Sequence, residues 1–505
     1  MKALLVAMAA VGLVLVLSFV CFNEGYSDDD YLYVLYTDAE SNLDLIDVYE
    51  SHIEDGKPTA LAQRYRISDS EGGINPAWKF DKETGIGPFN TFYAAINLLD
   101  DCPCYDVDDA SEKRLSTSVG GIAYVLDPDD LTRTLKGHSF DLALYNVMLI
   151  IPTVYWAPGT VVAEKTEGNL VEGTEYNVLY ISSSSSYTPA GHAKVSGMVA
   201  YAHSASLTPG KADYRSLVYP YLGIGVYESY ATNLNDAVGA GKIVSQSGRV
   251  PASNFTVDQF KDLADGLTPA AEQKQRSDYQ LWNYNQWTLN KIMSYTVMGS
   301  KNSQVMVGYG YTVGNTSCAV SGSTDTVGFV GNASMTQSAT GEYYAEWGKT
   351  ASKLFIESSW GSMNEFVGDA FVAGDSPQTL YLFVGNYLGG QKMIDIRTQP
   401  SASQTWPDIY VTGESHRNIC GMSTHPATWD TPIFADGNLE AYKDTAFPGD
   451  IVNANEGGIN SLTVGGRWDN QEFAGVSFVC GGYDIGLANE FRGARLVYLM
   501  SEDVF

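Results

Sequence analysis

The sequence predicts an α+β protein with short antiparallel strands, two helices and many loops. Its 505 residues include 50 glycines and 33 tyrosines, a composition typical of sheets and loops. From about residue 120 onward, apolar runs of strand length alternate with Gly, Pro and Asp. Two longer segments carry helix-capping signals instead. Both kinds of element therefore have local support in the sequence.

The N-terminal segment is long and apolar enough to cross a membrane as a helix. Residues 3–22 carry no charge, and as a helix they would span about 30 Å, the thickness of a bilayer core. Lys2 precedes this run and Glu24 follows it, which predicts that the remaining chain lies outside the cell. We expect residues 1–25 to be a single-pass transmembrane anchor or a signal segment, so the protein is anchored at the cell surface or secreted.

Residues 26–115 form an acidic N-terminal region, with 20 acidic and seven basic side chains. Its sheet-like stretch is Tyr31 to Tyr36, and we interpret the region as a stalk or a small cap. The whole chain has a formal net charge of -29, so a phosphate backbone would be repelled. Nucleic acid is therefore excluded as a partner.

Two helices are predicted in the middle of the chain. Thr256 begins a capping box, and Gly266 marks the end of this first helix. The second is predicted to begin after Ser277 and to end at Gly299. Its apolar residues spread around most of the circumference, which predicts a helix buried on several sides.

Residues with catalytic or metal-binding patterns are scarce. The six histidines are scattered, and neither a zinc-binding HExxH pair nor a G-x-S-x-G nucleophile motif is present. Cys102 and Cys104 lack a second Cys or His pair at zinc spacing. The acidic pairs that Glu357 forms with Glu365 or Asp369 are expected to have structural roles. We expect no catalytic residue, no metal and no cofactor.

Several motifs follow one another in a recognisable order between residues 120 and 498. They begin with NVMLIIPTVYW and YPYLGIGVYESY, continue with IESSWGSMNEFVGDAF, and end with GGRWDNQEFAGVSFVC and RGARLVY. This order resembles the C-type-lectin-like proteins of phage tails and prokaryotic surfaces. That group includes the variable proteins of diversity-generating retroelements and, more distantly, the formylglycine-generating enzymes (sulfatase-modifying factors). The resemblance implies a C-type-lectin-like ligand-binding domain over residues 116–505.

The closing motifs are similar to that family's final segment, in which a glycine pair precedes an aromatic residue and the last strand carries a buried arginine. The matching residues here are Gly465, Gly466, Trp468 and Arg495, and the resemblance implies that they are scaffold. Glycines let backbones approach closely, and Trp468 would fill a gap in the core. Arg495, if buried, needs carboxylate or carbonyl partners.

The same resemblance implies that residues 469–473 and 479–492 are presented at the surface. In the variable proteins of this family, such positions contact the ligand. Aromatic side chains supply contact area, and acids and amides supply directed hydrogen bonds. The candidate ligand-binding residues are Asp469, Asn470, Glu472, Phe473, Tyr483, Asp484, Asn489, Phe491 and Arg492.

These observations favour a cell-surface ligand-binding or adhesion protein that displays variable-type loops without catalysis. Its partner would be a surface protein or glycan of another cell or virus, and its own membrane would hold residues 3–22. One alternative is a divergent enzyme of the formylglycine-generating type. That reaction uses two nearby cysteines after the glycine–aromatic motif, where this chain has Asp469 and Asn470, with Cys480 later. A phage-tail receptor-binding protein is the other alternative.

Overall fold

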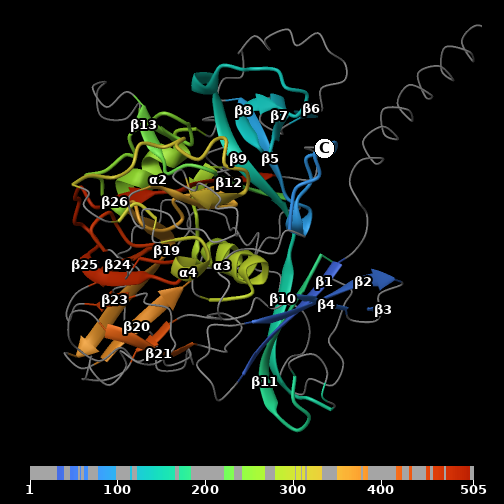
Figure 1. The fold of residues 1–505 in the computed structure, drawn as a ribbon. Coiled ribbons are helices and arrows are strands. Elements are labelled where there is room, and N and C mark those ends of the chain that lie inside the picture. The colour runs from blue at the N-terminus through green and yellow to red at the C-terminus, as the bar shows by residue number, and fades with distance from the viewer. Residues whose placement is uncertain are drawn as a thin grey trace, which may run out of the picture.

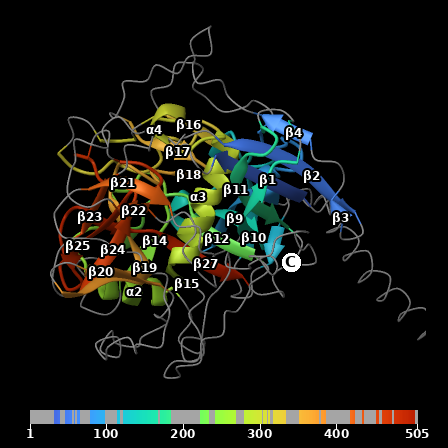
Figure 2. The same ribbon diagram turned by 90° about the horizontal axis from the view of Figure 1, so that it is seen from below.

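The computed structural model consists mainly of β-strands. The residues it describes lie within 31–97, 114–183, 221–332, 350–384, 417–434 and 451–500, with shorter gaps inside these ranges. Three large sheets contain most of the strands, and the helix α3 (Tyr284–Met298) lies between the first and the third of them (Figures 1 and 2). The principal hydrophobic core joins side chains from all three sheets and from α3.

The first sheet combines early and late segments of the chain. Leu32 in the first of its strands pairs with Ser182, so the centre of this sheet joins residues that are far apart in sequence. Tyr33 and Leu35 face the principal core, while Leu32 and Val34 face a smaller cluster, as the two-residue period of a strand requires. The strand order is β10 (Tyr155–Val162), β11 (Glu175–Ser182), β1 (Tyr31–Asp38), β2 (Asp47–Glu54) and β3 (Lys57–Pro58), with β4 (Ala62–Tyr65) paired to β2.

The second sheet is assembled from the widest range of the sequence. Strands on both sides of residue 115 pair within it, because β5 lies between β7 and β9. Its order is β15 (Tyr279–Leu281), β27 (Leu496–Met500), β12 (Tyr221–Gly225), β9 (Tyr145–Pro152), β5 (Phe92–Asn97), β7 (Ile122–Asp127) and β6 (Arg114–Ser116), with β8 (Asp130–Thr134) paired to β7.

The third sheet carries the closing motifs. It is mixed, since β26 runs parallel to β19 and β23 runs parallel to β25. Its order is β20 (Thr379–Val384), β19 (Asn364–Ser376), β24 (Ile459–Val464), β25 (Val479–Asp484), β23 (Ile451–Ala454), β21 (Arg417–Met422) and β22 (Pro432–Phe434), with β26 (Arg492–Ala494) paired to β19.

The remaining elements are short. One two-stranded sheet joins β13 to β14, and one three-stranded sheet joins β16, β17 and β18. These elements are β13 (Tyr230–Thr232), β14 (Lys242–Val244), β16 (Val330–Asn332), β17 (Ser352–Leu354), β18 (Ile356–Glu357), α2 (Val257–Asp265), α4 (Ser303–Met306) and the 3₁₀ turns η1 (Pro88–Asn90) and η2 (Leu142–Leu144).

The first predicted helix is confirmed, and the start of the second is wrong. Thr256 caps α2 through its predicted capping box, and Gly266 ends it. The second helix, α3, begins at the capping residue Asn283, because residues 279–281 form the strand β15 instead. Its predicted end at Gly299 and its predicted burial on several sides are confirmed.

The predicted α+β class with an N-terminal membrane helix is a further correction. The described part of the chain is mostly β, and its helices are α2, α3, the four-residue α4 and two 3₁₀ turns. Strand pairing depends on partners far away in sequence, whereas helix caps are local, so the sequence understates the sheets. No helix among the described residues has the length and apolar character needed to cross a bilayer. Residues 3–22 lie outside the described residues.

Candidate functional site

The frame beneath the candidate site is built around the buried side chain of Arg495. Its guanidinium forms an ion pair with Glu365, in which Nε donates to Oε2 at 2.9 Å and Nη2 donates to Oε1. Nη1 donates to the carbonyls of Gly225 and Val226 at 2.9 and 3.0 Å. Nη2 also donates to the carbonyl of Glu357 at 2.9 Å. The predicted carboxylate and carbonyl partners of Arg495 are therefore confirmed.

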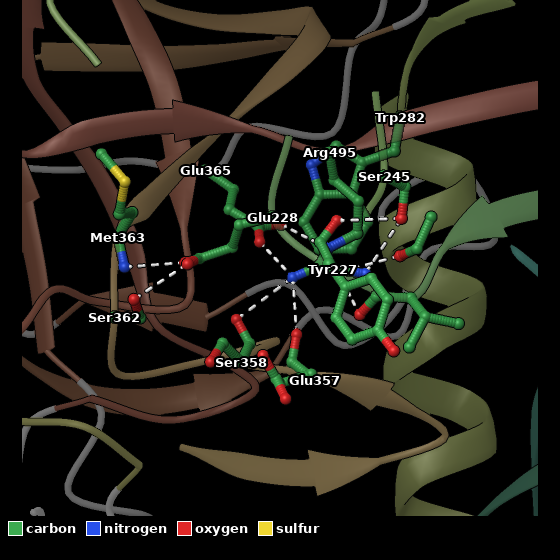
Figure 3. Close-up of polar contacts among 12 residues, drawn as sticks. Tyr227, Glu228, Ser245, Trp282, Glu357, Ser358, Ser362, Met363, Glu365 and Arg495 are labelled. Carbon is green, nitrogen blue, oxygen red and sulfur yellow. Dashed lines mark hydrogen bonds and ion pairs between the residues drawn. The ribbon is translucent and has the colours of Figure 1, made fainter. Parts of the chain in front are cut away.

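Glu228 extends this buried network toward the surface loops. Its carboxylate accepts hydrogen bonds from Ser362 Oγ at 2.8 Å and from the Met363 amide at 3.0 Å (Figure 3). Burial, followed by the charge of Glu365, raises the pKa of Glu228 well above its ordinary value. The Ser362 carbonyl accepts a hydrogen bond from the Trp468 amide at 3.1 Å. One buried carboxylate thus fixes the segment on which the 465–470 turn rests.

The glycine pair of the closing motif allows that turn to pack against its neighbours. Gly465 and Gly466 have φ values of 86° and 81°, where glycine is strongly favoured. A Cβ atom on Gly465 would lie 2.7 Å from the Ser359 carbonyl oxygen, and one on Gly466 would lie 2.8 Å from Ala474 Cβ. The close backbone approach expected of these glycines is present.

Phe491 lies between an arginine and a tryptophan. The Arg467 guanidinium is 3.9 Å from the centre of the Phe491 ring, and the Trp468 ring centre is 5.3 Å from it. Arg467 is held there by Asp469, to which its Nε and Nη2 donate at 2.5 and 3.1 Å. Phe491 is half-buried, so it supports the surface as well as forming part of it.

The loop between β25 and β26 has a fixed backbone. Asp484 Oδ1 accepts a hydrogen bond from the Gly486 amide at 2.8 Å, and Asn489 Oδ1 accepts one from the Phe491 amide at 3.1 Å. The Asn254 amide donates to the Asn489 carbonyl at 2.9 Å. These turns use short polar side chains to satisfy the local backbone, which holds the loop in one shape.

Arg492 stabilises the same loop from below. Its Nη1 donates to the Leu487 carbonyl at 2.9 Å, and its guanidinium lies 4.4 Å from the centre of the Tyr483 ring and 5.5 Å from that of Phe366. The side chain is fully buried, and its Nε and Nη2 atoms make no hydrogen bond. In this structure Arg492 positions the loop and is not part of its outer surface.

The structure brings most of the nine predicted residues together but exposes them unequally. Asp469 and Asp484 are exposed, whereas Asn470, Tyr483, Asn489 and Phe491 are half-buried and Arg492 is buried. Glu472 and Phe473 lie outside the described residues. Sequence reasoning missed three exposed members of the loop, Leu487, Ala488 and Glu490. The sequence signal for them is that they lie beside the turn-forming residues Gly486 and Asn489 and before Arg492.

The acidic residues singled out in the sequence have partners within the fold. Glu357 accepts hydrogen bonds from the amides of Gly322 and Thr324 at 2.8 and 2.9 Å. Asp369 accepts one from the Tyr284 amide at the start of α3 at 2.7 Å, and burial raises the pKa of Asp369 to about 6. Each carboxylate therefore satisfies backbone groups that would otherwise be buried without partners.

The thiols and the side chains that could bind a metal are dispersed among the described residues. Cys318 and Cys480 are free, and burial raises the pKa of both thiols, that of Cys318 to about 12. Cys102 and Cys104 lie outside the described residues. In the part of the chain that the structure describes, no three His, Cys, Asp or Glu side chains converge as a metal site would require.

Comparison with solved structures gives weak likenesses. No family model and no curated protein matches the chain. One solved structure to which it is similar is entitled "Major Tropism Determinant U1 Variant", with 10% sequence identity, coverage of 92% of this chain and 86% of that chain, and a TM-score of 0.23. A likeness at this level carries no argument about fold or function.

Proposed function

We propose that the protein is a non-enzymatic binding protein that attaches to an external partner through residues 467–470 and 484–491, named here the loop surface. One observation carries this proposal. The backbone of the loop surface is fixed by buried groups such as Arg492, whereas the side chains of Leu487, Ala488 and Glu490 are exposed. Such a division lets exposed side chains determine specificity without determining stability.

The chemistry of the loop surface supports recognition. Asp484 and Glu490 are exposed carboxylates, and Leu487 is an exposed apolar side chain. Tyr483 and Phe491 add half-buried aromatic rings. Apolar and aromatic area combined with directed polar groups is the composition of protein recognition surfaces. The partner class covered by this proposal is a surface protein or a glycan of another cell or virus.

The buried ionisable groups near the loop surface have structural partners, which further supports binding without a chemical step. Glu365 is paired with Arg495, and Glu228 accepts two hydrogen bonds from residues 362–363. Each of these carboxylates is buried and has its oxygens occupied. Groups engaged in this way maintain the frame of the loop surface.

The test is the binding of fluorescently labelled protein to arrays of cell-surface proteins and of glycans. We expect specific signals that fall roughly tenfold or more when Asp484→Asn, Leu487→Ser and Glu490→Gln are combined, because contacts at the centre of an interface dominate its affinity. The matched control is Val171→Ser, Glu172→Gln and Glu175→Gln, which changes one exposed apolar and two exposed acidic residues at the β10–β11 hairpin. Signals that both variants retain equally, or no signal on either array, would contradict the proposal.

A further inference from the structure

Three strongly exposed apolar side chains lie on the loop surface or on segments that hydrogen bonds connect to it. Among the described residues, the large apolar side chains with the most exposure are those of Val250 (59%), Val171 (54%), Val162 and Val320 (52% each) and Leu487 (41%). Val162 and Val171 belong to the β10–β11 hairpin, whereas the other three belong to loops around the candidate site. Exposed apolar side chains that gather in one place mark interaction surfaces.

Hydrogen bonds join the two valine-bearing segments to each other. The Gly248 amide donates to the Ser321 carbonyl at 2.9 Å, and the Ser321 amide donates to the Arg249 carbonyl at 2.9 Å. Val250 and Val320 each adjoin one of these bonded residues, so the two exposed valines lie on paired segments. The Arg249 guanidinium, next to Val250 in the sequence, is 5.2 Å from the centre of the Tyr230 ring.

The same segments are also attached to the frame of the loop surface. The Asn254 amide donates to the Asn489 carbonyl at 2.9 Å, which links residues 248–254 to the loop that carries Leu487. The Ala319 amide donates to Ser362 Oγ at 3.2 Å, which links residues 319–321 to the Glu228 network. Val250, Val320 and Leu487 are therefore held by one connected framework.

Charge narrows the kind of partner that fits. Asp484 and Glu490 are exposed and form no salt bridge with any described residue, so their charges are available to a partner on the loop that carries Leu487. A second copy of the chain has the same acids and the same net charge of -29, which opposes self-association. Arg249 beside Val250 is stacked on Tyr230, so the free charge of this area is that of Asp484 and Glu490. Apolar side chains next to exposed carboxylates complement a protein surface that combines apolar residues with lysines or arginines.

We propose that Val250, Val320 and Leu487 form one contact area with the acids of the loop surface, and that this area binds a protein bearing an apolar patch bordered by basic side chains. This inference rests on the proposed function and narrows its partner class to proteins. Burying the three apolar side chains supplies affinity, and the carboxylates supply orientation and the attraction of basic partners.

The experiment uses a displayed library of random peptides selected on the full chain. The enriched peptides are synthesised, and their affinities are measured by fluorescence anisotropy. We expect them to combine Lys or Arg with apolar residues, and to bind roughly tenfold more weakly when Val250→Ser and Val320→Ser are combined. The control combines Val162→Ser with Val171→Ser, which changes two equally exposed valines, and is expected to bind as the unchanged protein does.

A second measurement tests the role of charge. Combining Asp484→Asn with Glu490→Gln is expected to weaken binding and to reduce its salt dependence, because exposed ion pairs are screened by salt. Circular dichroism melting of every variant checks that each retains its fold. Enriched peptides that lack basic residues, or a failure to enrich any peptide, would overturn the inference.

Other outcomes separate this inference from the proposed function. If Leu487→Ser weakens peptide binding and the variant with Val250→Ser and Val320→Ser does not, the loop surface still binds a partner. In that case Val250 and Val320 do not belong to the contact area. If the array signals are confined to glycans, the loop surface binds a partner of another class, and the inference of a protein partner is wrong. If neither Leu487→Ser nor the valine pair changes peptide binding, and the array signals are also unchanged in the loop-surface variant, both proposals fail.

Discussion

Arg495 connects several segments that are distant from one another in sequence. Its guanidinium pairs with Glu365, which is 130 residues earlier in the chain, and it also binds carbonyls in residues 225–226 and 357–358. The sequence predicted that a buried arginine here needs such partners. It did not identify them, because no local pattern relates residue 495 to segments so distant.

The first prediction concerns this ion pair. Arg495→Met leaves the Glu365 carboxylate buried without its counterion, so the free energy of unfolding should fall by about 3–5 kcal/mol. Urea denaturation monitored by tryptophan fluorescence measures the change. Adding Glu365→Leu to the first variant should restore part of the loss, because the uncompensated charge is removed. A single variant as stable as the unchanged protein would show that the pair does not hold these loops.

The second prediction compares two glycines with nearly the same φ angle. Gly465 and Gly137 have φ values of 86° and 85°, but a Cβ atom on Gly137 meets nothing within 4 Å. Gly137→Ala should therefore cost about 1–2 kcal/mol from backbone strain alone. Gly465→Ala should cost roughly 1–3 kcal/mol more, because its new methyl group overlaps the Ser359 carbonyl. Equal losses in thermal melting would contradict the close-approach explanation.

At the scale of elements, the two main helices differ in how visible they are in the sequence. The cap, body and end of α2 form one local pattern, and the prediction matched all three. The beginning of α3 was misplaced because residues 279–281 are apolar enough to continue a helix. They form β15 because Tyr279 and Leu281 pair with Tyr498 and Leu496 in β27, and that pairing is not visible from nearby residues.

The third prediction compares the caps of these helices. The Asn283 side chain accepts from the Gln286 amide in the buried N-terminus of α3, whereas the Thr256 cap of α2 is exposed. Thr256→Ala should cost about 0.5–1 kcal/mol, and Asn283→Ala about 1–2 kcal/mol, since water cannot replace the lost acceptor in a buried site. Differential scanning calorimetry of both variants checks this order, and a larger loss for Thr256→Ala would contradict it.

The loop surface was predictable in position but not in detail. Its range follows from the glycines and Arg495 that flank it, and those residues have the expected roles. Individual exposures depend on tertiary packing, so Arg492 was placed outside although it lies beneath the loop. Val250 and Val320 were missed for the same reason, since an exposed valine looks like a core valine in a sequence.

At the scale of the whole molecule, strand pairing between distant segments accounts for the incorrect fold class. The second sheet brings together residues from 92 to 500, and strands that are neighbours in it are mostly not neighbours in sequence. Apolar runs indicated that strands exist. Their number per sheet and their order depend on long-range contacts that composition and periodicity do not encode.

The fourth prediction concerns pH. Burial raises the pKa of the carboxyls of Glu228, Glu357, Glu365 and Asp369 above their ordinary values. A raised folded-state pKa means that the folded protein binds protons more readily than the unfolded chain, so stability is fully present below the unfolded pKa and is lost as pH rises through the folded pKa. The free energy of unfolding should therefore be larger at pH 5 than at pH 7.5.

Asp369 provides the control for this effect. Its pKa rises from 3.8 to about 6, so its contribution changes between these values and amounts to at most about 3 kcal/mol. Asp369→Asn keeps an oxygen that accepts from the Tyr284 amide but cannot titrate. Urea titrations at several pH values should show a flatter pH dependence in this variant. Stability that rises from pH 5 to pH 7.5 in the unchanged protein would contradict the prediction.

The position of β27 has a consequence for how the protein is made. This strand, Leu496–Met500, is buried along its whole length and lies between β12 and β15. Ribosomes synthesise it after every other described strand, so the second sheet lacks this strand until residues 496–500 are made. A chain cut short by a nonsense codon before Leu496 leaves two unpaired strand edges, which are signals for aggregation and degradation. Truncated translation products should therefore aggregate or be degraded more readily than the full chain.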